Sequence, residues 1–129
     1  MLKGEIETMD ILFVDDERMI ISALERNLRD SDWYIDYALS GPEALIKLGK
    51  RHFDVVVTDM AMPAMTGDRL LREVKELDPE ITRIIMSGHA DQSLGVADGE
   101  LAHRWLDKPC DPTYLLQVLQ EVEKEKRFN

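Results

Sequence analysis

Residues 55–59 read Val-Val-Val-Thr-Asp, three β-branched apolar residues followed by a hydroxyl and a carboxylate. A short continuous apolar run is typical of a strand that is buried on both faces, as the strands of parallel sheets are. After a loop that contains Pro63, apolar residues recur at helical spacing: Leu70, Leu71, Val74 and Leu77. The segment therefore predicts a buried strand, a loop and a helix, with Asp59 at the end of the strand.

The same alternation continues on both sides of this segment. Further strands are predicted at residues 11–14, 33–38, 84–86 and 105–106, and the alternating polarity of residues 33–38 indicates a sheet edge. Further helices are predicted over residues 18–28, from the Ser40-Gly41-Pro42-Glu43 capping signal onward, over residues 92–100, and after the Asp111-Pro112 cap. Strands that alternate with helices build βαβ units, so we predict an α/β fold: a doubly wound, five-stranded parallel sheet with helices on both faces.

Size, charge and cysteine content restrict the function classes. The chain has 129 residues, which predicts a single domain with a core over about residues 9–123. With 16 Lys and Arg against 26 Asp and Glu its formal net charge is −10, so we expect this domain to bind no nucleic acid. No apolar run is long enough to cross a membrane, and the only cysteine, Cys110, excludes an internal disulfide. We therefore expect a cytoplasmic protein.

Polar side chains stand where the predicted strands end: Asp15, Asp16, Asp59, Ser87 and Lys108. In open parallel sheets, ligands bind outside the carboxyl ends of the strands. We therefore expect these side chains to meet at one edge of the sheet, although they lie far apart in the sequence.

Carboxylates that meet in this way need a countercharge. Two of them about 5 Å apart repel by roughly 3 kcal/mol at an effective dielectric constant of about 20. Carboxylate oxygens with open coordination positions suit Mg²⁺, so we predict a magnesium site at Asp15, Asp16 and Asp59. With the cation and Lys108 in place, a phosphoryl group can be held against Asp59 as the nucleophile, while Ser87 donates a hydrogen bond to a phosphoryl oxygen.

Four segments resemble those of response-regulator receiver domains, the CheY-like modules of bacterial two-component signalling. They are ILFVDDE (residues 11–17), VVVTDMAMPAMTG (55–67), IIMSG (84–88) and WLDKP (105–109). The resemblance covers essentially the whole chain. It implies a flavodoxin-like sheet of order 2-1-3-4-5, Asp59 as the phospho-acceptor, and Mg²⁺ held by Asp15, Asp16, Asp59 and the backbone carbonyl of Ala61. It also implies a cis bond between Lys108 and Pro109.

The same resemblance implies a switch. Ser87 takes the place of the family's Thr or Ser, and Trp105 stands where the family usually has a Tyr or Phe that rotates on phosphorylation; core packing is the alternative reading of Trp105. Phosphorylation would then reshape the face formed by residues 92–100, the strand at 105–106 and the last helix, which also offers a surface for a homodimer. Hydrolysis of the phosphoryl group would reset the domain, which modifies itself and is not a turnover enzyme.

The resemblance also implies partners outside this chain. A sensor histidine kinase or a phosphotransfer protein would donate the phosphoryl group, and an output domain would follow on the C-terminal side of a longer response regulator. Residues 102–111, AHRWLDKPCD, are similar to those of receivers fused to HD-type output domains of the HDOD or HD-GYP kind.

Three other functions make different demands on the residues. A haloacid-dehalogenase-like phosphohydrolase needs a second acid two residues after its nucleophile, where this chain has Ala61. A flavodoxin-like flavin protein needs a neutral phosphate loop, whereas Asp15, Asp16 and Glu17 would repel a phosphate. A receiver fold that serves only as a docking module, without phosphorylation, remains open.

Overall fold

A five-stranded parallel sheet forms the centre of the molecule in the computed structural model, which describes residues 8–88 and 101–127. Its strands are β1 (Asp10–Val14), β2 (Tyr34–Ala38), β3 (Val55–Asp59), β4 (Thr82–Ser87) and β5 (Arg104–Asp107). They lie in the order β2-β1-β3-β4-β5, and every neighbouring pair is parallel. The predicted α/β fold and strand order are confirmed.

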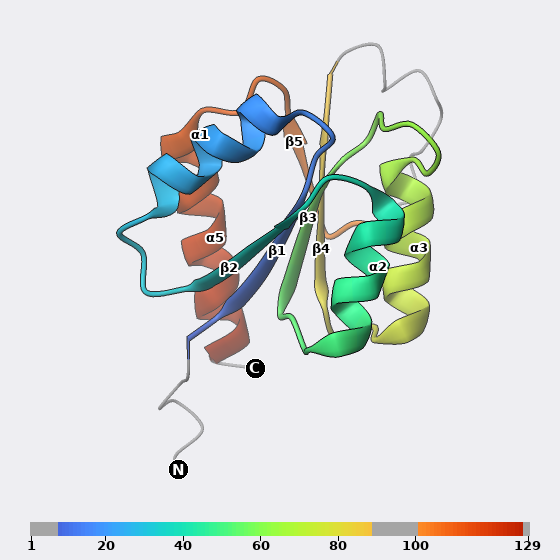
Figure 1. Cartoon of the computed structure of the whole chain (residues 1–129). Coiled ribbons are helices and arrows are strands. Elements are labelled where there is room, and N and C mark those ends of the chain that lie inside the picture. The colour runs from blue at the N-terminus through green and yellow to red at the C-terminus, as the bar shows by residue number, and fades with distance from the viewer. Residues whose placement is uncertain (1–7, 89–100, 128–129) are drawn as a thin grey trace.

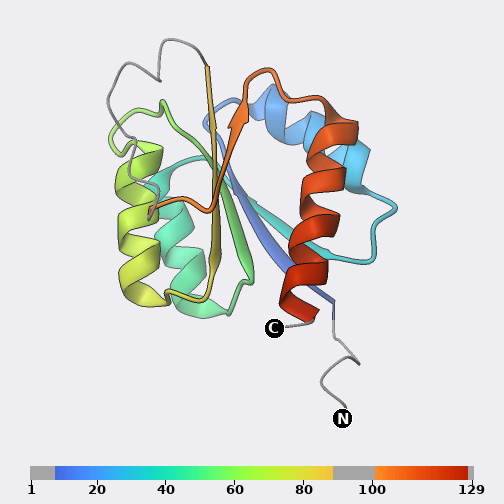
Figure 2. The ribbon, with the colours of Figure 1, turned by 180° about the vertical axis from the view of Figure 1, so that it is seen from behind.

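Helices cover both faces of this sheet (Figures 1 and 2). On one face lie α1 (Arg18–Leu28) and α5 (Pro112–Arg127), and on the other lie α2 (Gly41–Lys50) and α3 (Gly67–Leu77). The helix predicted over residues 92–100 lies outside the described residues. Among the helices of the described ranges, none has the length and apolar content needed to span a bilayer.

The inner strands of the sheet contribute to two separate hydrophobic cores. In β1, Leu12 and Val14 face the core under α2 and α3, while Ile11 and Phe13 face the core under α1 and α5. This follows from the alternation of side chains along a strand. All four side chains are fully buried, which explains why the strand reads as a continuous apolar run.

The edge strand β2 begins one residue later than predicted. Its side chains are mostly half-buried, and it pairs only with β1, as the alternating sequence of an edge strand indicates. Trp33 precedes the strand, and its indole N–H donates a hydrogen bond to the Glu123 carboxylate of α5 over 3.0 Å. Trp33 therefore ties the start of the edge strand to the last helix.

Two predicted helix starts, at Ser40 and Asp111, are capped as the sequence indicates. Ser40 Oγ accepts a hydrogen bond from the Glu43 N–H over 3.2 Å, and Asp111 accepts one from the Thr113 N–H over 2.8 Å. Thr66 occupies the position before α3, but its side chain makes no capping hydrogen bond. The start of α3 therefore depends on other contacts, which involve Gly67.

Candidate functional site

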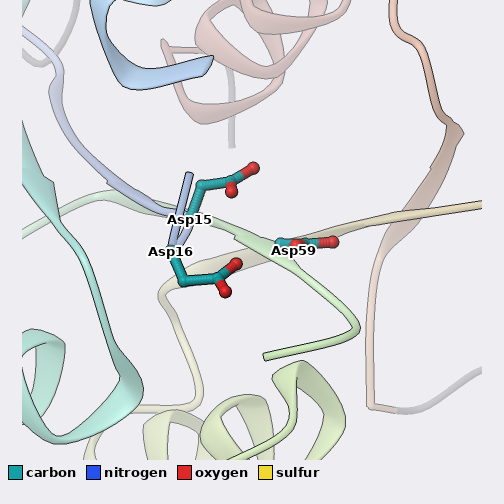
Figure 3. Close-up of side chains that lie close together, drawn as sticks. All are labelled: Asp15, Asp16 and Asp59. Atoms are coloured by element: carbon teal, nitrogen blue, oxygen red, sulfur yellow. The ribbon is translucent and has the colours of Figure 1, made fainter. Parts of the chain in front are cut away.

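Three carboxylates meet at the carboxyl ends of β1 and β3. Val14 pairs with Thr58 in the sheet, so Asp15 and Asp59 follow at the same level of neighbouring strands. Asp15 and Asp59 are buried, whereas the adjacent Asp16 is exposed. One carboxylate oxygen from each of the three lies within 4.8 Å of the others. Figure 3 shows these side chains directed to the same side of the strand ends, so the predicted acidic cluster is formed.

Lys108 bridges the two buried carboxylates. Its Nζ lies 3.1 Å from Asp15 Oδ2 and 3.1 Å from Asp59 Oδ1. The other oxygen of Asp15 accepts a hydrogen bond from the Glu17 N–H over 2.9 Å, which fixes the orientation of that carboxylate. The Lys108–Pro109 bond is cis, as the resemblance implied. A residue 49 positions from Asp59 in the sequence is thus in direct contact with it.

Burial and this contact oppose each other in setting the charges. Burial raises the pKa of Asp59 above its ordinary value, and the hydrogen bond and positive charge of Lys108 offset only part of that effect. Burial alone would lower the pKa of Lys108, but hydrogen bonds and attraction to Asp15 and Asp59 outweigh it and raise that pKa. Lys108 is therefore held as a cation. Its charge does not fully offset the burial of Asp59, so the ionised form of that carboxylate is less stable than it would be in water.

Ser87 and Ala61 complete the predicted set. Asp59 pairs with Met86, so the buried Ser87 lies one residue further along β4 at the same edge. The Ser87 carbonyl accepts a hydrogen bond from the Lys108 N–H over 2.9 Å, which links the ends of β4 and β5. The backbone of the exposed Ala61 lies near the Asp59 carboxylate and lowers its pKa. A role of the Ala61 carbonyl as a metal ligand stays a prediction.

Trp105 lies on β5 but not in a core. Its side chain is 38% exposed, whereas its neighbour Leu106 is buried in the core under α1 and α5. Because β5 is an edge strand and side chains alternate, Trp105 lies on the opposite face from Leu106. The core-packing alternative for Trp105 is therefore wrong. Its role as a rotating switch stays a prediction.

Two features near the site had no role assigned from the sequence. Gly67, the first residue of α3, packs against the backbone of Asp59. Ala64, in the loop after β3, has a φ of 69°, in the left-handed region that favours glycine. A glycine that begins a helix was a visible signal for Gly67, because alanine is the better helix former. Nothing in the sequence pattern marks Ala64.

Comparisons with known proteins agree with this geometry. The sequence profile described as "Response regulator receiver domain" matches residues 11–120. The chain is 29% identical to the C4-dicarboxylate transport transcriptional regulatory protein DctD of Rhizobium meliloti, over 92% of this chain and 26% of that protein. It is 33% identical to the hydrogenase transcriptional regulatory protein HoxA of Cupriavidus necator, over 87% of this chain and 23% of that protein. The chain thus spans about a quarter of the length of these two relatives.

Solved structures give the same result. A response regulator receiver domain protein from Clostridium thermocellum superimposes with a TM-score of 0.84 at 31% identity, covering 93% of this chain and 98% of that one. The signal receiver domain of an HD domain-containing protein from Pseudomonas fluorescens Pf-5 superimposes with a TM-score of 0.85 at 27% identity, covering 95% of this chain and 100% of that one.

Proposed function

Because this chain belongs to the family of response regulator receiver domains, we propose that it takes a phosphoryl group onto Asp59 from a sensor histidine kinase or a phosphotransfer protein. The observation that carries this proposal is the placement of Lys108. Its ammonium group lies 3.1 Å from the Asp59 carboxylate, at a strand edge where two further carboxylates converge. A cation next to a buried carboxylate is the pairing that can hold a phosphoryl group against its nucleophile.

The transfer needs little more than positioning and charge neutralisation. An oxygen of the Asp59 carboxylate forms a bond to phosphorus as the bond from phosphorus to the donor breaks, and the donor leaves with that electron pair. Lys108 balances negative charge on the phosphoryl oxygens, and the Ser87 hydroxyl donates a hydrogen bond to one of them. The backbone of Ala61 favours the ionised form of the Asp59 side chain. Hydrolysis of the acyl phosphate restores Asp59, so the domain modifies itself and is not a turnover enzyme.

The acidic cluster has the donor set for Mg²⁺. All its candidate ligand atoms are oxygens, and they lie within 4.8 Å of one another. Burial leaves the pKa of Asp59 raised even with Lys108 beside it, so further positive charge at this place would stabilise the carboxylate. Asp15, Asp16 and Asp59, with the Ala61 carbonyl, would hold the ion. When bound, Mg²⁺ would supply charge neutralisation for the transferring phosphoryl group.

The proposed output of the modification is a change at one face of the domain. A phosphorylated Asp59 carries up to one more negative charge than the free carboxylate. We infer that the Ser87 hydroxyl and Trp105 move toward it and bias the surface of β5, α5 and residues 92–100, of which only β5 and α5 lie in the described ranges. This face would contact an output domain, a partner or a second copy of the domain.

We further propose that the domain acts within a longer response regulator. The two transcriptional regulators matched above are about four times longer than the stretch that this chain covers. The receiver domain of an HD domain-containing protein is among the similar structures, which favours the HD-type output that residues 102–111 suggested. A transcriptional output, as in DctD and HoxA, is the alternative.

The phospho-acceptor role can be tested with a small phosphodonor. We expect the protein incubated with acetyl phosphate and Mg²⁺ to gain the mass of one phosphoryl group, and Asp59→Asn and EDTA each to abolish this gain. A gain of mass that survives Asp59→Asn would contradict the proposal. Sustained release of phosphate from a general phosphatase substrate would favour the haloacid-dehalogenase alternative, and absence of any adduct would favour the docking module.

A further inference from the structure

Gly67 lies against the backbone of the proposed phospho-acceptor. An ideal Cβ placed on Gly67 would be 2.2 Å from the Asp59 carbonyl oxygen and 3.0 Å from both the Asp59 carbonyl carbon and the Met60 Cα. The Gly67 N–H donates a hydrogen bond to the Met60 carbonyl over 2.8 Å. The first residue of α3 is therefore packed directly onto the end of β3.

The local conformation gives no reason for a glycine at this position. Gly67 begins α3 and has no left-handed φ, so alanine would suit its backbone better. What excludes a side chain is the Asp59 carbonyl, a backbone group that cannot rotate away. Gly49 of α2 provides the contrast, because a Cβ added there meets nothing within 4 Å.

The loop between β3 and α3 is also held from its other side. An ideal Cβ on Gly41 would be 2.5 Å from Met65 Sδ and 3.0 Å from Met65 Cβ, so the start of α2 packs tightly on this loop. Between Met65 and Asp59, Ala64 already adopts a left-handed φ of 69°. A side chain at position 67 therefore cannot be accommodated simply by moving the loop outward, and the displacement falls on Asp59 and Met60.

Displacing that backbone would disturb the two contacts that place the Asp59 carboxylate. One is the approach of Lys108 Nζ at 3.1 Å, and the other is the nearby backbone of Ala61, which lowers the pKa of Asp59. Both depend on where the chain runs from Asp59 to Ala61. A nucleophile misplaced by about 1 Å can lose roughly 100-fold in rate.

We propose that Gly67 is a positioning residue for phosphorylation of Asp59. The absence of a side chain at position 67 lets α3 start against the Asp59 carbonyl and so sets the position of the carboxylate relative to Lys108. This inference rests on the proposed function of Asp59, and it adds a residue of α3 that would not itself touch the phosphoryl group.

The test compares Gly67→Ala with Gly49→Ala and the unchanged protein. Each is incubated with acetyl phosphate and Mg²⁺, and the initial rate of adduct formation is measured by intact mass over a range of donor concentrations. We expect the saturating rate of Gly67→Ala to fall by at least about tenfold, with little change in the donor concentration for half-maximal rate, while Gly49→Ala behaves as the unchanged protein.

Urea unfolding of each variant shows the conditions in which it is fully folded, and the rates are compared only there. Trimethylamine N-oxide, which favours folded states, is added to all three if Gly67→Ala unfolds too readily. A folded Gly67→Ala that reacts as fast as the unchanged protein would overturn the inference. So would its failure to fold even with the osmolyte, because the contact would then be structural. Absence of an adduct on the unchanged protein would instead overturn the proposed function.

Discussion

Lys108 is the residue on which the proposed chemistry depends most. It reaches two buried carboxylates from a different strand end, and both are 3.1 Å from its ammonium nitrogen. A lysine at the end of a predicted strand is an ordinary surface residue when read alone. Its importance follows only from the fold: β5 pairs with β4 alone, but the Lys108 side chain after it reaches across to the acids at the ends of β1 and β3.

Replacing Lys108 by Met should slow phosphorylation while leaving a folded protein. The change keeps much of the apolar stem but removes the charge that would balance the phosphoryl oxygens. We expect a loss of roughly 100-fold in the rate of adduct formation, the size typical for removal of one preorganised donor. Lys124→Met is the matched control, because Lys124 is an exposed residue of α5. Equal rates for the two variants would show that Lys108 has no part in the reaction.

Ala64 allows a prediction about stability at the scale of one residue. Its φ of 69° costs an alanine about 1 kcal/mol that a glycine does not incur. We therefore expect Ala64→Gly to leave the free energy of unfolding unchanged or to raise it by up to about 1 kcal/mol, as measured by urea denaturation. Ala23→Gly in α1 is the control, because there the same substitution should destabilise by about 1 kcal/mol. Equal destabilisation by both changes would contradict the conformational explanation.

At the scale of elements, β4 begins before the strand predicted at residues 84–86. The prediction started too late because the buried Arg83 is charged and does not extend the apolar run. Arg83 is 3% exposed, and its guanidinium donates hydrogen bonds to the carbonyls of Leu101, Pro79 and Ile81. These bonds compensate for taking the charge out of water. Arg83 therefore joins the turn before β4 to the segment that enters β5, at the end of the sheet opposite the acidic cluster.

His103 in that segment makes stability depend on pH. Its Nδ1 accepts a hydrogen bond from the Arg83 N–H over 2.9 Å, so the neutral ring is the bonded form. Burial lowers the pKa of His103 below its ordinary value of 6.5, and the charges of Arg83 and Lys126 lower it further, with Glu125 opposing them. The unfolded chain therefore binds this proton at a higher pH than the folded protein does.

The sign of the resulting pH dependence follows directly. The stability contributed by His103 is fully present above about pH 6.5 and is lost as the pH falls toward the lowered pKa of the folded state. His103→Asn keeps an acceptor at the position of Nδ1 but cannot take up a proton. We expect urea midpoints measured from pH 7.5 down to about 5.5 to fall more steeply for the unchanged protein than for His103→Asn. Parallel curves would contradict this role of His103.

At the scale of the whole molecule, the parallel sheet could be predicted because both of its faces are buried. The apolar runs at residues 11–14 and 55–57 make up most of β1 and β3, and each run contributes side chains to both cores. Two other features could not be predicted. The charge of Arg83 made the predicted strand shorter than β4, and the exposure of Trp105 depends on the edge position of β5, which no local pattern reveals.

The candidate site, too, could be predicted from the sequence only in part. Asp15, Asp16, Asp59, Ser87 and Lys108 could be named from the sequence because each stands near the end of an apolar run, and the structure brings them to one edge of the sheet. A glycine at the start of a helix marks position 67 as unusual, but its packing on the Asp59 carbonyl could not be predicted, because that contact depends on the path of a loop. The predicted roles of Mg²⁺, of the Trp105 switch and of residues 92–100 stay predictions.

The most direct measurement of the whole proposal is to locate the phosphoryl group on the chain. After reaction with acetyl phosphate and Mg²⁺, borohydride reduces an aspartyl phosphate to homoserine, and tryptic cleavage after Arg51 and Arg69 isolates residues 52–69. That peptide contains Asp54, Asp59 and Asp68, which serve as internal controls for one another. We predict homoserine at position 59 alone, in the sample with Mg²⁺ and not in the sample with EDTA. A label at another residue, or at none, would contradict the assignment of Asp59 as the phospho-acceptor.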